Sequence, residues 1–398
     1  MNARTDIFIS GGGIAGLTAA LALSRLGFLV TLADPAPPPA AAEADGSDLR
    51  STAFLQPALE LLQEFGLWEE LAPFATPLET LTVIDCSGDP PQPRTRRAFQ
   101  SSDLGARAFG WNLPNWLTRK LLAERLALAP GVDLQLGTSF KSILTRESEA
   151  FVTLDDGTRL RTRLAVAADG RDSPLREAVG IPTETTRYGQ KALAFTVSHD
   201  LAHENVSTEL YLSGGAFTLV PLPDHMGQPA SAVVWMNDGP EAARLMAMDD
   251  EAFSEAATTR SCNVLGQLRL ASPRRIWPVV TRRATRLIAE RTAMIAEAAH
   301  VLPPIGAQGL NTSLHDVRTL VDLAREAPEN IGQQAWLDRY AKARERDIQA
   351  RARVIDLYNR VCRSDAAPVQ ALRSLGLTLV HDVSPLRKGI MRAGLGST

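Results

Sequence analysis

The feature that most constrains the fold of this chain is a glycine-rich turn close to its N-terminus. The pattern GxGxxG occupies Gly11 to Gly16 and follows Ile7 to Ile9, a short apolar segment typical of a buried strand. Apolar residues recur at helical spacing from Ala15 to Leu26, and Phe28 to Ala33 again has the character of a strand. The sequence therefore predicts a strand, a tight turn, a helix and a second strand.

Each glycine of the pattern has a physical role at this spacing. Gly11 permits the tight turn, Gly13 lets a pyrophosphate approach the backbone, and Gly16 lets the helix pack closely on the strand. The N-terminus of the helix supplies N–H donors and a positive dipole end. Asp34 ends the second strand and can accept hydrogen bonds from a ribose. The pattern predicts dinucleotide binding rather than a mere packing turn, but it does not separate NAD from FAD.

Length and composition narrow the class of protein. A single core stops growing near ~250 to 300 residues, so a chain of 398 residues should hold two core units. Its three cysteines, Cys86, Cys262 and Cys362, include no CxxC pair, so we expect neither a disulfide framework nor a metal site. A cytoplasmic, reducing compartment is the default expectation. The 42 basic side chains are scattered and balanced by 45 acidic ones, so no nucleic-acid partner is expected.

The remaining elements are predicted from periodicity. No apolar run reaches the ~18 to 20 residues of a membrane span. Helices are expected over Ser51 to Leu71, Pro114 to Ala129 and Gln333 to Cys362, the last with one apolar stripe. Short strands separated by Gly, Pro and Asp turns fill residues 190 to 237, which predicts an antiparallel sheet in a second domain. The stripe of the last helix consists of Leu337, Ala341, Ile348, Ala352, Ile355 and Cys362.

Three further segments carry a family resemblance. AADGRDSPLR covers residues 167 to 176, AMIAEAAHVLPPIGAQGLNTSLHDV covers residues 293 to 317, and DLRSTAF covers residues 48 to 54. Together with the N-terminal glycines, they resemble the fingerprints of single-component FAD-dependent aromatic monooxygenases. The second segment is similar to the signature of the ubiquinone-biosynthesis hydroxylases, and HVLPPIGAQGLN is its most specific part.

The resemblance implies an α/β fold. Its main part would be a Rossmann-like FAD-binding domain of the para-hydroxybenzoate hydroxylase type, made of residues 1–75, 100–185 and 277–330. An inserted antiparallel β-sheet substrate domain would take residues 76–99 and 186–276. Residues 331–398 would form a C-terminal helical region.

The resemblance also assigns residues to the cofactor. The N-terminal glycines and Asp34 would bind the ADP half of FAD, Arg50 would lie beside the cofactor, and Asp169 would serve both FAD and transient NAD(P)H docking. The segment from Pro304 to Asn311 would enclose the isoalloxazine, whose reduced form a helix N-terminus stabilises. The implied cofactor-binding residues are Gly11, Gly13, Ala15, Gly16, Asp34, Arg50, Arg119, Asp169, Glu297, Gly306, Gly309, Leu310 and Asn311, and the flavin-enclosing ones are Pro304, Gly306, Gln308 and Gly309.

Three positions depart from the family pattern. The usual Gly-Asp is Ala296-Glu297 here, the usual Asn-x-Gly is Asn311-Thr312-Ser313, and His315 replaces an arginine. Glutamate keeps a carboxylate for the ribityl hydroxyls, so we expect FAD binding to survive.

The histidines do not form a metal-ligand pattern. His300 follows an apolar strand, and we expect a hydrogen-bonded core histidine there rather than a catalytic base. Asp316 is expected at the start of a helical turn, in a structural role. His199, His203 and His225 are expected on the surface.

The implied reaction is hydroxylation of a lipophilic phenol or quinol. NAD(P)H would reduce FAD, O2 would add at C4a, and the hydroperoxide would transfer its oxygen to the ring of a polyprenylated precursor of ubiquinone. The sequence identifies no catalytic residue and no base for the substrate. A hydroxylase of a small soluble phenol and a catalytically silent flavoprotein scaffold are the alternatives.

Charge is unevenly distributed along the chain. Residues 331–398 hold 12 Lys or Arg against 6 Asp or Glu, within a chain of net charge -3. This basic region could meet a ubiquinone-biosynthesis complex or the inner face of a membrane, which would make the protein peripheral. The alternative is a solvated helical cap on the flavin domain.

Overall fold

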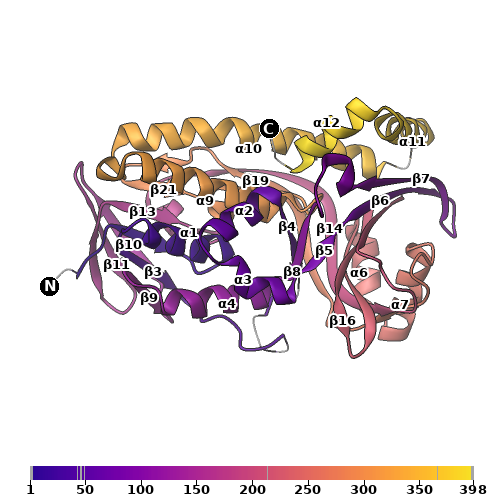
Figure 1. Ribbon diagram of the computed structural model, residues 1–398, viewed down its shortest axis with the longest axis horizontal. Helices are drawn as coiled ribbons and strands as arrows, with labels where there is room; N and C mark the ends of the chain where they lie inside the picture. The colour runs from indigo at the N-terminus through magenta and orange to yellow at the C-terminus, as the bar shows by residue number, and fades with distance from the viewer. Residues whose placement is uncertain are drawn as a thin grey trace.

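A mostly parallel sheet, built from strands between residues 7 and 294, forms the part of the molecule that contains the N-terminus (Figure 1). The computed structural model describes residues 3–42, 44, 47–48, 50–212, 214–364 and 366–395. In this sheet only the edge strand β20 runs antiparallel to its neighbour. Its strands, in spatial order, are β20 (Ile288–Ala289), β21 (Thr292–Met294), β13 (Leu164–Ala167), β2 (Ile7–Ser10), β3 (Val30–Asp34) and β9 (Val132–Leu136).

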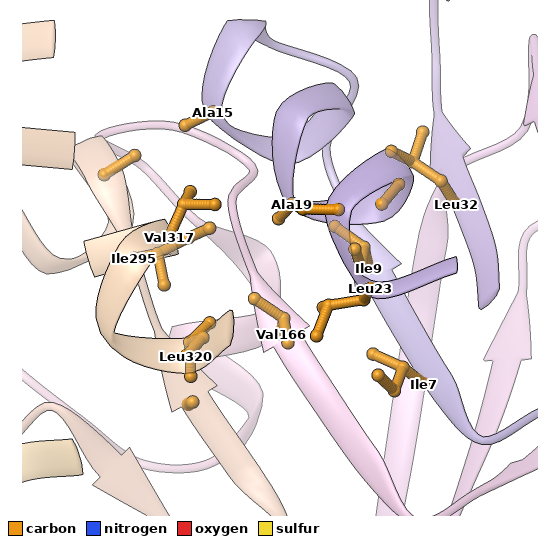
Figure 2. Close-up of a cluster of buried hydrophobic side chains, with 14 of the residues drawn as sticks. Ile7, Ile9, Ala15, Ala19, Leu23, Leu32, Val166, Ile295, Val317 and Leu320 are labelled. Carbon is orange, nitrogen blue, oxygen red and sulfur yellow. The ribbon is translucent and has the colours of Figure 1, made fainter. Parts of the chain in front are cut away.

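Helix α1 (Ile14–Arg25) packs on this sheet between α4 (Asn115–Ala127) and α9 (Gln308–Glu326). Its residues from Ala15 to Leu23 are all buried, because alanines and leucines face both the strands and the flanking helices. Figure 2 shows Leu23 beside the strand residues Ile9 and Val166. The predicted strand, turn, helix and strand are confirmed.

The expected helix over Ser51 to Leu71 is wrong in its first part. Ser51–Leu55 forms strand β4, which pairs with β8 (Gly110–Pro114), and β8 also pairs with β5 (Thr76–Leu78). Pro57 lies in the first turn of α2 (Gln56–Glu64), a position that suits proline. Gly66, with a φ of +57°, separates α2 from α3 (Trp68–Leu71). Pairing with a distant strand overrides local helical spacing here.

A nine-stranded sheet forms the other half of the molecule. The strands expected between residues 190 and 237 are antiparallel, but β15 and β6 pair in parallel, so the sheet is mixed. Strand β6 comes from far upstream, and it therefore reaches β15 without the tight hairpin that would force an antiparallel pair. The strands are β22 (His300–Val301), β19 (Arg275–Ala284), β14 (Thr183–His199), β17 (Gln228–Asp238), β16 (Gly215–His225), β15 (Val206–Leu212), β6 (Thr80–Ser87), β7 (Gln92–Gln100) and β18 (Leu268–Leu270).

The two faces of this sheet carry different partners. Leu193, Phe217 and Trp235 pack on α6 (Gly239–Ala247) and α7 (Asp250–Arg260). The opposite face, which carries Tyr211 and Met236, turns toward three C-terminal helices. These are α10 (Gln334–Arg363), α11 (Ala367–Asp382) and α12 (Ser384–Leu395), which lie along one side of the molecule (Figure 1).

The long helix expected from Gln333 to Cys362 is confirmed as α10, and all six residues of its apolar stripe are buried. None of the described helices has the length and hydropathy to cross a bilayer. The remaining elements are β1 (Ala3–Arg4), β10 (Phe140–Thr145), β11 (Ala150–Leu154), β12 (Arg159–Thr162), α5 (Pro174–Ala178) and α8 (Ala296–Ala299), with 3-10 turns at Ala72–Phe74, Ser101–Leu104 and Pro328–Asn330.

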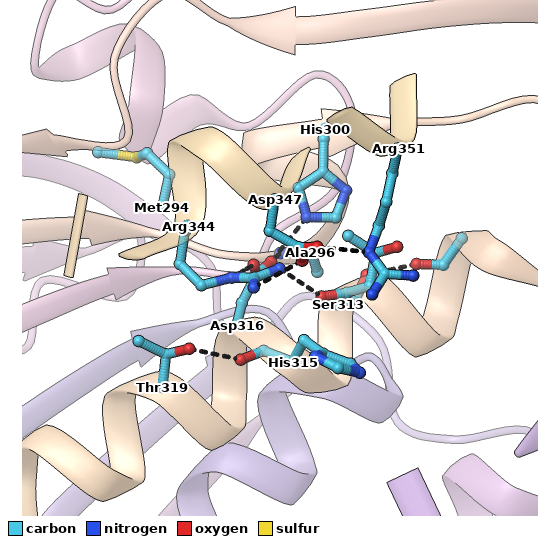
Figure 3. Close-up of polar contacts among 12 residues, drawn as sticks. Met294, Ala296, His300, Ser313, His315, Asp316, Thr319, Arg344, Asp347 and Arg351 are labelled. Carbon is cyan, nitrogen blue, oxygen red and sulfur yellow. Dashed lines mark hydrogen bonds and ion pairs between the residues drawn. The ribbon is translucent and has the colours of Figure 1, made fainter. Parts of the chain in front are cut away.

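A buried carboxylate joins the parallel sheet to α10 (Figure 3). Asp316 lies inside α9, not at its start, and is fully buried. Its Oδ2 accepts the N–H of Ala296 at 2.9 Å and pairs with His300 Nε2 at 2.7 Å, and its Oδ1 accepts Arg344 Nε at 2.7 Å. Burial alone would raise the pKa of Asp316, but His300 and Arg344 lower it below its ordinary value. His300 is therefore the hydrogen-bonded core histidine that the sequence predicts.

We predict that Asp316→Ala lowers the free energy of unfolding by about 3 to 5 kcal/mol, because it leaves the buried Arg344 guanidinium without its main partner. Urea unfolding followed by tryptophan fluorescence measures this. Asp322→Ala on the exposed side of α9 is the control and should cost about 1 kcal/mol or less. The depressed pKa means that Asp316 stabilises the fold above about pH 4 and that this contribution is lost as pH falls further. Equal stability of the two variants at neutral pH would contradict this role.

Candidate functional site

A cavity of about 1320 Å³ opens where the parallel sheet, the nine-stranded sheet and the C-terminal helices meet. Its walls include the glycine turn, the first turns of α9, and parts of α11 and α12. Because it joins the predicted dinucleotide motif to an apolar chamber, it is the candidate site.

The glycine turn meets the cavity in the way that its spacing predicts. A Cβ on Gly16 would lie 2.0 Å from the carbonyl oxygen of Gly11, and a Cβ on Gly11 would lie 2.3 Å from that of Ala168. These two positions therefore require glycine for close packing. Gly13, by contrast, faces open space at the cavity wall. Among the glycines of this turn, Gly13 is therefore the one where a bulky anion can approach the backbone.

Asp34 and Arg119 brace the glycine turn. Asp34 Oδ2 accepts the N–H of Gly12 at 2.6 Å, and Oδ1 accepts Arg119 Nη2 at 3.0 Å. Arg119 Nε also donates to the Gly12 carbonyl at 2.7 Å. Arg119 lines the cavity, whereas Asp34 lies behind the turn. A ribose hydroxyl that donates to Asp34 would bind a carboxylate that already accepts hydrogen bonds from Gly12 and Arg119.

Asp169 lies between Ala168 and Gly170, which line the cavity, but it does not line the cavity itself. Its Oδ2 accepts the hydroxyl of Ser10 at 2.9 Å and the N–H of Leu175 at 3.2 Å. Its Oδ1 is buried and has no hydrogen-bond partner in the described part of the chain. Burial raises the pKa of Asp169, and its hydrogen bonds oppose that shift. A buried acceptor without a partner is costly, so this oxygen fits a bound hydroxyl or amide.

Arg50 and Glu297 both line the cavity. Arg50 donates to both carboxylate oxygens of Asp48, at 2.7 and 2.8 Å, and stacks 4.8 Å from the ring centroid of Trp277. Glu297 pairs with Arg171 at 3.3 Å, and 43% of its side chain is exposed. The carboxylate that replaces the family's aspartate is therefore accessible.

The first turn of α9 forms another wall. Pro304, Gly306, Gln308, Gly309 and Leu310 line the cavity, and Ala307 adopts a left-handed φ of +55° just before the helix. Asn311, the next residue of α9, is buried. Its amide donates to the carbonyls of Ala53 and Ala307 and accepts the N–H of Leu55, so it ties β4 to α9.

The structure also shows lining residues that the motifs did not identify. Asp48 and Asn115 lie beside Arg50, joined by a hydrogen bond of 2.9 Å. The DLR segment signalled Asp48, but no local pattern marks Asn115. On the nine-stranded sheet, Ser207, Glu209 and Tyr211 face the cavity because alternate residues of β15 share a face.

One expectation about the histidines is wrong. His199 is buried, not at the surface, with Nδ1 2.7 Å from the carbonyl of Leu201 and Nε2 3.0 Å from Ser231 Oγ. His199 ends β14, where it pairs with Leu268 of β18, and both ring nitrogens find partners within the fold. His225 is exposed and His203 half-buried. None of the described residues forms a cluster suited to a metal ion.

Comparisons with known proteins agree with this geometry. The profile of the FAD binding domain family matches residues 4–354. Ubiquinone hydroxylase UbiL of Rhodospirillum rubrum is 32% identical over 396 residues, which cover 98% of this chain and 90% of that one. Ubiquinone hydroxylase UbiM of Neisseria meningitidis serogroup C is 26% identical over 406 residues, covering 98% and 85%.

A solved structure shares the whole fold. p-Nitrophenol 4-monooxygenase PnpA from Pseudomonas putida DLL-E4 superposes with a TM-score of 0.80 at 16% identity, over 100% of this chain and 99% of that one. The likeness extends over both sheets and the C-terminal helices.

We predict that Gly13→Ala leaves the free energy of unfolding nearly unchanged but weakens FAD binding at least about tenfold, ~1.4 kcal/mol, because the new Cβ occupies the approach of the pyrophosphate. Flavin fluorescence titration of the apoprotein measures the affinity. Gly389→Ala on α12, where a Cβ also meets open space, is the control and should bind FAD normally. Equal affinity of both variants would show that the phosphates lie elsewhere.

Proposed function

Since the chain belongs to the FAD-binding domain family, as an FAD-dependent monooxygenase related to the ubiquinone-biosynthesis hydroxylases, we propose that it hydroxylates the ring of a polyprenylated phenol in ubiquinone biosynthesis. Bound FAD would accept a hydride from NAD(P)H and activate O2 for the transfer of one oxygen atom. The protein would bind the cofactor, orient the phenol and exclude water.

The observation that carries this proposal is the shape and lining of the cavity. Beyond the flavin motifs it continues between the nine-stranded sheet and the C-terminal helices. An isoprenoid tail gains about 0.8 kcal/mol for each methylene that leaves water, so such a chamber favours tailed phenols over small ones. The apolar lining there includes Leu81, Val83, Phe99, Val220, Val234, Leu377 and Met391.

The residues around the glycine turn fit FAD. We propose that the ADP half lies along Gly11, Gly13, Ala15 and Gly16, with its ribose at Asp34. Arg50, Arg119 and Glu297 would contact the middle of the cofactor, and Asp169 would use its unsatisfied Oδ1. The isoalloxazine would lie at the start of α9, where Gly306, Gly309, Leu310 and Asn311 bring N–H groups and the positive end of the helix dipole.

The division of the chain follows the same logic. We propose that residues 76–99 and 186–276 form the substrate side, residues 1–75, 100–185 and 277–330 the flavin side, and residues 331–398 a helical cover. The pairing of β6 with β15 supports the assignment of residues 76–99 to the substrate side, although they are distant in sequence from residues 186–276.

We predict that the FAD-loaded protein, given NAD(P)H and O2, adds one oxygen atom to 2-farnesylphenol and turns it over faster than 4-hydroxybenzoate, because only the tailed phenol fills the apolar chamber. Mass spectrometry of the products and oxygen uptake measure this. Faster turnover of 4-hydroxybenzoate would favour a hydroxylase of small phenols. Normal ubiquinone levels in a deletion strain would contradict a place in that pathway.

We also propose that α11 and α12 meet an anionic membrane surface. Leu372, Leu375 and Leu379 recur along one side of α11 and are 68%, 67% and 58% exposed. Arg353 and Arg360 are exposed on the neighbouring α10. Leu372 also lines the cavity, as does Ile390 of α12, so the chamber reaches the same surface that would touch lipid. A tailed substrate could then enter without crossing water.

We predict that Leu375→Glu with Leu379→Glu reduces binding to phosphatidylglycerol vesicles at least about tenfold, since each leucine loses ~1.5 to 3 kcal/mol of apolar burial in lipid. Vesicle sedimentation measures this. Neither residue lines the cavity, so FAD content should not change. Leu128→Glu, at a more exposed leucine after α4, is the control. Unchanged vesicle binding in the double variant would exclude this surface.

A further inference from the structure

A carboxyl group lies in the apolar chamber, away from the flavin motifs. Glu209 on β15 lines the cavity with Ser207 and Tyr211, while Thr208 and Leu210 turn to the other face of the sheet. Only 9% of Glu209 is exposed. Burying a carboxyl group here costs free energy.

Two tyrosines extend from this carboxyl. The hydroxyl of Tyr211 donates to Glu209 Oε2, and it lies 2.6 Å from the hydroxyl of Tyr358 on α10. The two rings meet edge to face, with centroids 5.8 Å apart. Tyr358 is 39% exposed and lines the cavity, so part of its exposed surface faces the chamber. Three polar groups thus form one connected line in an apolar wall.

Among the described residues, no cation pairs with Glu209. Burial raises the pKa of Glu209, and the hydrogen bond from Tyr211 lowers it by less. Burial also raises the pKa of Tyr211 and of Tyr358 well above that of an ordinary tyrosine. The nearby arginine of α11, Arg373, is already paired with Asp85 of β6.

The other titratable neighbour is the Cys362 thiol on α10. Burial, and then the charge of Glu209, raise the pKa of Cys362 to about 12. Cys362 is therefore a neutral thiol at physiological pH. A raised pKa brings the carboxyl group of Glu209 closer to the pKa of a phenol, which is about 10. Glu209 is therefore the group in this part of the chamber that is suited to accept a proton from a phenol.

We propose that Glu209 is the general base that removes the phenolic proton of the substrate, with Tyr211 and Tyr358 as positioning residues that hold its carboxylate. This assignment rests on the proposed function, because it requires a phenol in the chamber. Deprotonation raises the electron density of the ring carbons ortho and para to the oxygen, which are the ones that accept an electrophilic oxygen atom.

The proton and electron balance closes without a further reagent. The substrate O–H bond breaks, its electron pair stays on the phenolate, and the proton bonds to Glu209. One oxygen atom of O2 enters the ring as a hydroxyl group, and the other leaves as water, with two electrons from NAD(P)H. The three hydrogens of the new hydroxyl group and the water are the hydride of NAD(P)H, one solvent proton and the hydrogen that the ring carbon releases. The hydroxylated ring carbon then loses its hydrogen as a proton, the ring regains aromaticity, and Glu209 returns its proton to the original oxygen.

The test compares wild-type holoenzyme with Glu209→Gln, using 2-farnesylphenol as the probe. Ionisation of the bound probe is followed by ultraviolet difference absorbance, and single-turnover hydroxylation of the pre-reduced enzyme is followed by product analysis, both from pH 6 to 9. We expect hydroxylation at pH 7 to fall about 100-fold. The bound phenol should ionise only as pH approaches its own pKa of about 10. FAD content and the rate of flavin reduction by NAD(P)H should not change.

Further variants separate a base from a structural carboxyl. Glu209→Asp should restore part of the rate. Tyr211→Phe removes a hydrogen bond that lowers the pKa of Glu209, so the acid limb of its pH profile should move to higher pH. These two variants carry the test if Glu209→Gln does not fold. Glu255→Gln, at an exposed position on α7, is the control and should match the wild type.

Each result is decisive for one of the two proposals. A Glu209→Gln enzyme with the wild-type rate and pH profile would overturn the assignment of the base. So would a wild-type enzyme that leaves the bound probe un-ionised at pH 7. A wild-type enzyme that ionises the probe through Glu209 but forms no hydroxylated product would overturn the proposed function and leave the base assignment standing.

Discussion

The packing of α9 and α10 beside the parallel sheet depends on the buried carboxylate of Asp316. One side chain accepts the backbone N–H of Ala296, pairs with His300 and accepts the guanidinium of Arg344. It thereby fixes α8, β22 and α10 around α9, whose first turn borders the cavity. Ala296 has a φ of +55°, a left-handed conformation that costs an alanine about 1 kcal/mol or more. The hydrogen bond to Asp316 holds it there, so Ala296 can occupy a position where the family has glycine.

The cavity changes character along its length, and the change matches two different tasks. Near the glycine turn its walls offer backbone N–H groups, arginines and the unsatisfied oxygen of Asp169, which suit a charged cofactor. Between the nine-stranded sheet and α11 the cavity walls are mostly apolar, and Glu209 is an acidic residue within them. Arg373 crosses from α11 to Asp85 of β6, so a buried ion pair fastens the helical cover to the sheet. The apolar chamber is therefore closed by residues far apart in the chain.

Local motifs indicated more lining residues on the glycine-turn side of the cavity than on the side of the nine-stranded sheet. A Cβ would clash with backbone at Gly11 and Gly16 but would meet open space at Gly13, as the spacing of the pattern predicts. The helix expected over Ser51 to Leu71 was wrong because β4 finds a partner in β8, which local spacing does not reveal. The surface position expected for His199 was wrong because the end of β14 packs against β18 and the ring meets Ser231 of β17, which local sequence does not reveal.

By itself the sequence determined the glycine turn, the family and the apolar stripe of α10, because backbone sterics and helical periodicity act over a few residues. Only the tertiary structure decided that Glu209 and Tyr211 face a cavity, that Tyr358 meets them from α10, and that Asp316 is shared among several elements. The physical reason is that burial, proton affinity and ion pairing are properties of neighbours, and these neighbours come from segments that only the packed sheets and helices bring together.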